Sequence, residues 1–166
     1  AMSINKDTDA DDENPVSMKS ELLISIFDEL LKSGSSRMGI GVGAKDKSII
    51  DRCTIRVFAD YMNGRSDKEP TLMQLRDELL NQPESEAHDL ALCLEMFTTG
   101  SLNAFAHQSN VDVDKRIISY DILELGEQMK PIGLLIMLDN IMNRVIENRK
   151  KGKYTRVYID EAHLFF

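Results

Sequence analysis

Two adjacent carboxylates near the end of the chain, Asp160 and Glu161, have the side-chain type and the spacing that metal-assisted hydrolysis requires. They follow Val157, Tyr158 and Ile159, an apolar run that predicts a buried strand. A strand held by its neighbours fixes the backbone. The first carboxylate can then hold Mg²⁺ through water, and the second can orient or deprotonate an attacking water. We therefore assign Asp160 to a metal and Glu161 to catalysis, against the alternative of an ordinary strand that ends in solvated acids.

An apolar strand followed by Asp-Glu matches the Walker B motif of P-loop ATPases, which also need a phosphate-binding loop of the form G-x-x-x-x-G-K-[ST]. The nearest match is GIGVGAKDKS, in which Ala44 replaces the second glycine and Asp46 replaces the Mg²⁺-binding hydroxyl. The preceding LLKSGSSRM predicts a helix end and a loop instead of the required strand. We interpret the segment as a glycine-rich connection between helices, so the Walker A loop is absent from this sequence.

The elements that would position these residues fall into two parts. Within 15–100, apolar residues recur at helical spacing in four stretches, and two of the helix starts have capping signals, Asn14-Pro15 and Thr71 with Gln74. The runs 116–123 and 156–160 have the β-branched character that is typical of strands. A helix of about twenty residues is expected between the two runs. Strand, helix and strand predict a parallel βαβ unit.

Charge is unevenly distributed along the chain. The formal net charge of -8 weighs against the whole chain being a nucleic-acid groove. However, Arg144–Arg156 carries six basic side chains and only one acidic side chain, Glu147. A helix C terminus and its turn in solvent explain most of this charge, and contact with DNA is the alternative.

Two features bear on the cellular compartment. The longest apolar run, from Ile132 to Leu138, is far shorter than the roughly 20 residues of a membrane-spanning helix, and the first dozen residues contain no secretory signal. Cys53 and Cys93 both lie on the apolar side of a helical pattern. A reduced, cytoplasmic protein is the simplest interpretation.

Several longer segments resemble the conjugative-transfer ATPases of type IV secretion systems, in the form found in mobile elements of Gram-positive bacteria. The segments are YDILELG, MKPIGLL, NRVIENR and YIDEAHLFF, and the early DDENPVSMKSELL is similar to the family's entry into a helical insertion. The resemblance implies an internal part of a longer motor that uses Mg²⁺ and ATP, with Phe166 not its natural end. Because the Walker A loop is absent, the chain itself is expected to be inactive and to bind neither.

The resemblance also implies an organisation and partners. We expect a mainly α chain with a small α/β part: a flexible acidic start at 1–14, an all-helical insertion subdomain at 15–110, and a partial RecA-like core with its βαβ unit at 111–166. Type IV secretion subunits are the expected partners, and DNA is left open. We expect a hexamer for the parent, at the inner face of the cell membrane, and a dimer for this chain.

Two alternatives come from other classes. The letters of Asp160 to His163 spell the DEAH box of superfamily-2 helicases, but those enzymes typically carry a Thr-Pro-Gly-Arg-like motif upstream, and none occurs between Ser101 and Lys153. The helical part could instead be a non-enzymatic interaction module whose apolar faces dock other subunits. Tight nucleotide binding by this chain would count against that module.

Overall fold

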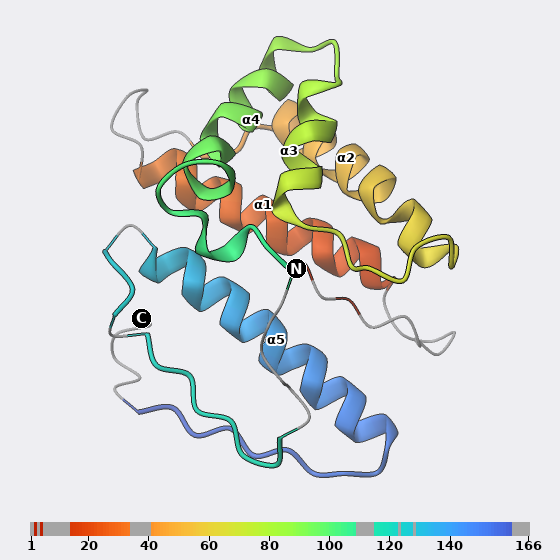
Figure 1. Ribbon diagram of the computed structural model, residues 1–166, viewed down its shortest axis with the longest axis vertical. Helices are drawn as coiled ribbons and strands as arrows, with labels where there is room; N and C mark the ends of the chain where they lie inside the picture. The colour runs from red at the N-terminus through yellow and green to blue at the C-terminus, as the bar shows by residue number, and fades with distance from the viewer. Residues whose placement is uncertain are drawn as a thin grey trace.

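Five α-helices and one short 3-10 helix form the regular structure of the part of the chain that the computed structural model describes, namely residues 2, 4, 14–33, 41–108, 115–122, 124–127 and 129–160. In chain order they are α1 (Pro15–Ser33), α2 (Ala44–Met62), α3 (Leu72–Leu80), α4 (Ser85–Thr98), η1 (Asn103–Phe105) and α5 (Lys130–Lys150) (Figure 1). The four helices expected within 15–100 are therefore confirmed.

Local capping explains where α1 and α3 begin. The Asn14 side chain accepts a hydrogen bond from the Val16 backbone N–H at 3.0 Å, at the start of α1. The expected capping box of α3 is present, and the Thr71 N–H donates to Gln74 Oε1 at 2.9 Å. These bonds satisfy donors that the first helical turn leaves without partners, so the sequence near the starts of α1 and α3 specifies those two boundaries.

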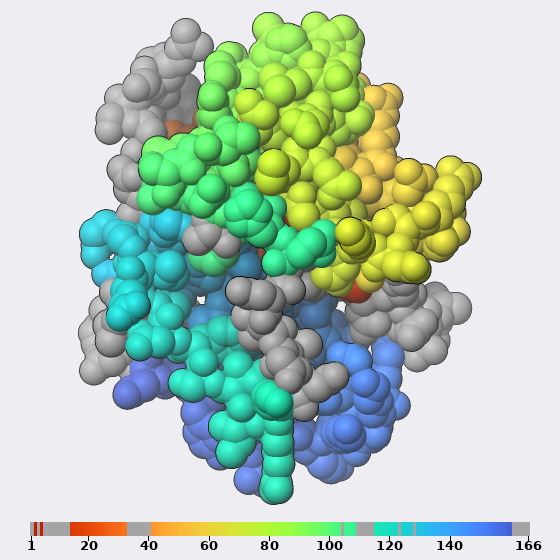
Figure 2. Space-filling view, viewed as in Figure 1, coloured from red at the N-terminus to blue at the C-terminus, as the bar shows by residue number. Residues whose placement is uncertain are grey.

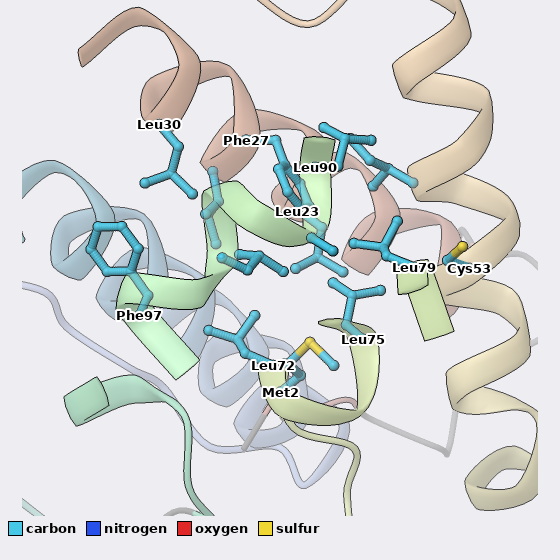
Figure 3. Close-up of a cluster of buried hydrophobic side chains, with 14 of the residues drawn as sticks. Met2, Leu23, Phe27, Leu30, Cys53, Leu72, Leu75, Leu79, Leu90 and Phe97 are labelled. Atoms are coloured by element: carbon cyan, nitrogen blue, oxygen red, sulfur yellow. The ribbon is translucent and has the colours of Figure 1, made fainter. Parts of the chain in front are cut away.

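The core lies where α1, α2, α3 and α4 meet (Figure 3). Phe27 of α1 and Phe58 of α2 are fully buried, and Leu75 and Leu79 of α3 pack into the same cluster. Burying each such side chain contributes about 1.5–3 kcal/mol. Met2 and Ile4 are also buried in this core, within the segment expected to be a flexible start, and the Met2 N–H donates to Pro70 O at 2.8 Å.

Helix α5 packs on α1 (Figure 1). Met129 and Ile132, at its N-terminal end, belong to the main core. Lys19 of α1, whose side chain is only 3% exposed, forms an ion pair of 2.5 Å with Asp139 of α5. The ranges predicted as an insertion subdomain and a motor core thus share one core and one buried ion pair.

The predicted partial RecA-like βαβ unit is wrong for the described structure. Helix α5 is present, but the described residues of 115–122 and 153–160 form no strand and no sheet. Both segments are extended chain that runs opposite to α5 in Figure 1, and 115–122 lies at the lower centre of the face shown in Figure 2. A physical reason is that two parallel strands without further neighbours cannot bury both faces of a sheet.

The orientation of α5 also differs from the sequence pattern. Leu138 and Met142 are apolar residues four positions apart, which places them on one side of α5, yet both are exposed. The face that packs toward the bundle instead carries Ile132, Leu135 and Ile136.

None of the described helices combines the length and the apolar character needed to cross a membrane.

Candidate functional site

The predicted acidic pair lies at the end of the drawn-out segment after α5. Asp160 is exposed, and Glu161 lies outside the described residues. The run before Asp160 was expected to be buried, but Tyr158 is 86% exposed, and Val157 and Ile159 are about half exposed. The described structure therefore does not provide the buried strand that would hold Asp160 rigidly.

Metal coordination at Asp160 would need ligands beyond the described part of the chain. Within that part, no three His, Cys, Asp or Glu side chains are grouped so that they could hold a metal ion. Asp160 does supply the carboxylate oxygen that Mg²⁺ accepts, and Mg²⁺ commonly binds one or two carboxylates together with waters and substrate phosphates. Asp160 thus fits one position of such a site, and the sequence neighbour Glu161 adds a second carboxylate.

The glycine-rich segment before α2 is closed to phosphate by the protein's own carboxylates. Asp46 Oδ2 accepts the Gly43 N–H at 2.9 Å, and Asp28 Oδ1 of α1 accepts the Val42 N–H at 3.0 Å. A phosphate cradle needs such backbone N–H groups free to bind oxygen. The interpretation of this segment as a connection between helices is therefore confirmed for 41–43, while Gly39 lies outside the described residues.

The position of Asp28 is fixed by close packing. A Cβ built on Gly41 would lie 2.0 Å from Asp28 Oδ1, so only glycine fits there without movement of that side chain. Hydrogen bonds from Lys32 and from the Val42 N–H lower the pKa of the Asp28 carboxyl. A charged carboxylate is thus held against the loop, and it repels a second anion.

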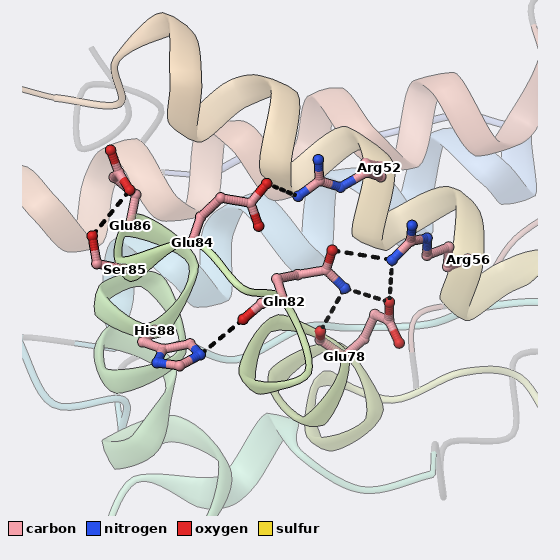
Figure 4. A network of polar contacts seen from close by, with 8 residues as sticks. All are labelled: Arg52, Arg56, Glu78, Gln82, Glu84, Ser85, Glu86 and His88. Carbon is pink, nitrogen blue, oxygen red and sulfur yellow. Dashed lines mark hydrogen bonds and ion pairs between the residues drawn. The ribbon is translucent and has the colours of Figure 1, made fainter.

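A polar cluster between α2 and the α3–α4 connection was not found from the sequence (Figure 4). Arg56 Nη1 donates to Glu78 Oε1 at 3.1 Å and to Gln82 Oε1 at 3.0 Å. Gln82 Nε2 in turn donates to Glu78 Oε1 at 2.7 Å, and Arg52 Nη2 donates to Glu84 Oε1 at 2.7 Å. The available signal was spacing, because Arg52 and Arg56 lie four residues apart on α2 and therefore share a helix face.

The electrostatics of this cluster indicate a structural role. Arg52 lowers the pKa of Glu84 through the hydrogen bond between them, and Glu84 raises the pKa of Arg52. Both groups are thus held in their charged forms, whereas a general acid or base must change its charge near the working pH. The cluster fastens the α3–α4 connection to α2.

The two cysteines are poor candidates for nucleophilic catalysis. Burial raises the pKa of Cys53 to about 11, and burial also raises the pKa of Cys93. Only the thiolate is an effective nucleophile, and raised pKa values keep both thiols protonated at neutral pH. Their packing in or beside the helical core agrees with a structural role.

Comparison of the chain with protein-family models, with curated proteins and with solved structures finds no match.

Proposed function

We propose that this chain is part of an ATP-hydrolysing motor of the class that powers conjugative DNA transfer through type IV secretion systems. The observation that carries the proposal is the pair Asp160 and Glu161, placed directly after an apolar run of β-type residues that is exposed in this chain. Soluble proteins seldom leave such a run uncovered, because its burial is favourable. Its exposure supports a role in which other parts of the motor cover it.

The two carboxylates have different tasks in the proposed reaction. Asp160 holds Mg²⁺ through water, and Mg²⁺ supplies positive charge that neutralises the phosphate oxygens. Glu161 accepts a hydrogen bond from the attacking water, which orients that water and draws away its proton. The phosphates are gripped by residues outside this sequence, because the Walker A loop is not in it.

The proposal includes partners and a location. The motor is a hexamer at the cytoplasmic face of the cell membrane, where it contacts other secretion subunits. The exposed residues Tyr158 and Ile159 also provide a surface through which this chain by itself associates with a second copy.

The catalytic assignment is tested in the whole motor protein by the change Glu161→Gln. We expect ATP binding to persist while turnover falls by about two to four orders of magnitude, the usual effect of removing a general base. Asp160→Ala should instead raise the Mg²⁺ concentration that activity requires, because the substitution removes a carboxylate assigned to the metal. Glu95→Gln, an equal charge change at an exposed position of α4, is the matched control and should be silent. Near-normal turnover in the Glu161→Gln protein contradicts the assignment.

The division of the nucleotide site is tested with the 166-residue chain alone. Calorimetric titration with Mg²⁺-ATP should show no saturable binding in the micromolar range, because backbone amides and a lysine of the missing loop provide most of the phosphate contacts. Saturable binding would show that this chain holds the phosphates itself. Light scattering in the same samples tests self-association, and a strictly monomeric mass at high concentration contradicts it.

A helical interaction module is the second candidate, and the surface of α2 and α4 favours it. Ile55 on α2 and Leu92 on α4 are both more than half exposed, and Met96 on α4 is also exposed. Apolar side chains at such positions suit contact with another subunit. Binding of a purified secretion-system subunit in the absence of nucleotide, lost in Leu92→Ser, would favour this candidate over the motor.

A further inference from the structure

The end of α5 and the chain after it form the most basic segment of the protein. Residues 149–156 contain five basic side chains and no acidic one. Since the whole chain has a net charge of -8, the remaining residues together carry -13. A positive segment on an otherwise negative protein attracts anions to one place and repels them elsewhere.

Backbone hydrogen bonds give this segment a defined shape. Helix α5 ends at Lys150, and Gly152 follows with a φ of 66°, a left-handed conformation that favours glycine. The Lys153 N–H donates to Asn148 O at 2.8 Å, which closes the turn. The Asn148 side chain donates to Thr155 Oγ1 at 2.8 Å, so the chain beyond the turn is tied back to the helix.

Stabilisation of the helix end explains only part of this charge. Cations in the last turn interact favourably with the helix dipole, which accounts for Arg149 and Lys150. That effect falls off within one turn, whereas Lys153 and Arg156 lie beyond the helix. Arg149, Lys153 and Arg156 are all exposed and form no ion pair with the described residues, in contrast to Lys151, which pairs with Glu147 at 2.5 Å.

An aromatic ring stands among these cations. Tyr154 is 101% exposed, so its ring contacts almost nothing in the protein. An exposed aromatic face flanked by cations is the arrangement by which proteins bind single strands, since a base stacks on the ring while its phosphates approach the cations. The segment lies along the lower edge of the molecule in Figure 1, below α5 and away from the α1–α4 bundle.

We propose that residues 149–156 bind single-stranded nucleic acid. The phosphates lie against Arg149, Lys153 and Arg156, and one base stacks on Tyr154. A duplex fits less well because its bases are stacked on one another and present no free face to the ring. A membrane surface is the lesser alternative, because surface-bound segments typically place their cations along an amphipathic helix, and here the cations continue into irregular chain.

The binding site and the proposed nucleotide site use different residues. Single-strand binding is assigned to Arg149, Lys153, Tyr154 and Arg156, whereas metal binding and catalysis are assigned to Asp160 and Glu161. Substitutions in one set leave the other set in place, so nucleic-acid binding and ATP hydrolysis are tested independently.

The test measures fluorescence anisotropy of a labelled 20-nucleotide oligothymidylate titrated with the 166-residue protein. We expect saturable binding at about 50 mM salt that weakens steeply as the salt concentration rises. Each phosphate that the protein neutralises on a single strand contributes about −0.7 to the slope of log K against log salt. Arg149→Gln, Lys153→Gln and Arg156→Gln together should weaken binding by at least about tenfold and reduce that slope by about 2.

Matched variants separate specific from general effects. The control triple Lys47→Gln, Arg65→Gln and Lys68→Gln changes the net charge equally at exposed positions of the bundle and should retain binding. Tyr154→Ala should weaken binding at least about fivefold, while Tyr154→Phe, which keeps the stacking ring, should not. Circular dichroism checks that every variant retains its helices.

Four outcomes overturn the proposal. They are the absence of saturable binding, an equal loss in the control triple, tighter binding of a 20-base-pair duplex than of the single strand, and binding to vesicles containing 30% phosphatidylserine without binding to the oligonucleotide. The last outcome would assign the segment to a membrane surface.

Discussion

The α1–α4 bundle and the segment that follows it, 115–160, contrast in how their apolar residues are used. In the bundle, Phe27, Phe58 and Leu79 are fully buried against one another. In the later segment, Ile117 and Tyr158 are each 86% exposed, although Ile117 precedes Ile118 and Tyr158 lies between Val157 and Ile159. Helical apolar faces can find partners within the same short chain, whereas β-type runs need neighbouring strands on both sides to be covered.

The largest effect is expected in the core of the bundle. Phe27→Ala should lower the free energy of unfolding by about 3–5 kcal/mol, because it removes a fully buried ring and leaves a cavity. Urea denaturation followed by circular dichroism measures the change. A loss below 1 kcal/mol would remove the contrast between the two regions, since Phe27 would then behave like an exposed residue.

The ion pair that joins the two regions should give the next largest effect. Lys19→Met removes the cation that pairs with Asp139. The loss in the free energy of unfolding should be below the roughly 3–5 kcal/mol expected for breaking a fully buried ion pair, because the Asp139 side chain is 19% exposed. Changing Asp139→Leu in the same protein should recover much of this loss. The four variants of this double-mutant cycle are compared by urea denaturation, and additive losses would show that Lys19 and Asp139 do not interact.

Acid should weaken the bundle through its carboxylates. The pKa values of Glu84 and Glu86 are lowered from 4.5 in the folded state, mainly by the Arg52 hydrogen bond for Glu84 and by a backbone hydrogen bond for Glu86. A lowered folded-state pKa gives stability that is present above the unfolded value and lost as pH falls through the folded value. The stability of the protein should therefore fall as pH decreases below about 4.5.

Substitution at Glu84 identifies the source of that acid sensitivity. Glu84→Gln should be less stable than the original protein at pH 7, and the difference should be smaller at pH 3, because more of Glu84 is protonated as the pH falls toward its lowered pKa. Denaturation midpoints at the two pH values provide the measurement. A difference that is the same at both pH values would mean that packing, and not charge, links Glu84 to Arg52.

The smallest effect is expected in the exposed run before Asp160. Val157→Ala should change the free energy of unfolding of this chain by no more than about 0.5 kcal/mol, because exposed positions away from special features usually have small effects. In the whole motor protein the same change should cost more, because the proposal places this run against other residues. Equal small effects in both proteins would argue that the run is exposed there too.

The helices of the bundle were predictable because their signals are local. Apolar spacing identified α1 to α4, and the capping box of Thr71 and Gln74 identified the start of α3. Each hydrogen bond that builds a helix or its cap joins residues at most a few positions apart, so neighbouring residues specify it. The segment GIGVGAKDKS was identified as a connection because Ala44 and Asp46 depart from the phosphate-loop pattern and no strand is predicted before it. In the structure the Asp46 carboxylate accepts the Gly43 N–H at the start of α2.

The candidate site was predictable only as a list of side chains. Asp160 and Glu161 stand out by type and spacing, but whether a buried strand holds them depends on partners that the nearby sequence does not specify. The prediction of a βαβ unit failed at this step. The β-type residues at 116–123 and 156–160 indicate only a local preference for extended backbone, whereas a sheet also requires hydrogen bonding between segments that are distant in sequence.

What the sequence by itself determined is therefore the set of α-helices, the starts of α1 and α3, and the acidic and basic residues that lie outside the helices. Only the tertiary structure decided that α5 turns Ile132 and Asp139 toward α1, that Lys19 is buried against Asp139, and that Arg56 meets Glu78 and Gln82. These contacts join residues from 22 to 120 positions apart. Burial and ion pairing act through space, so the distances that set their strength exist only after the helices have packed.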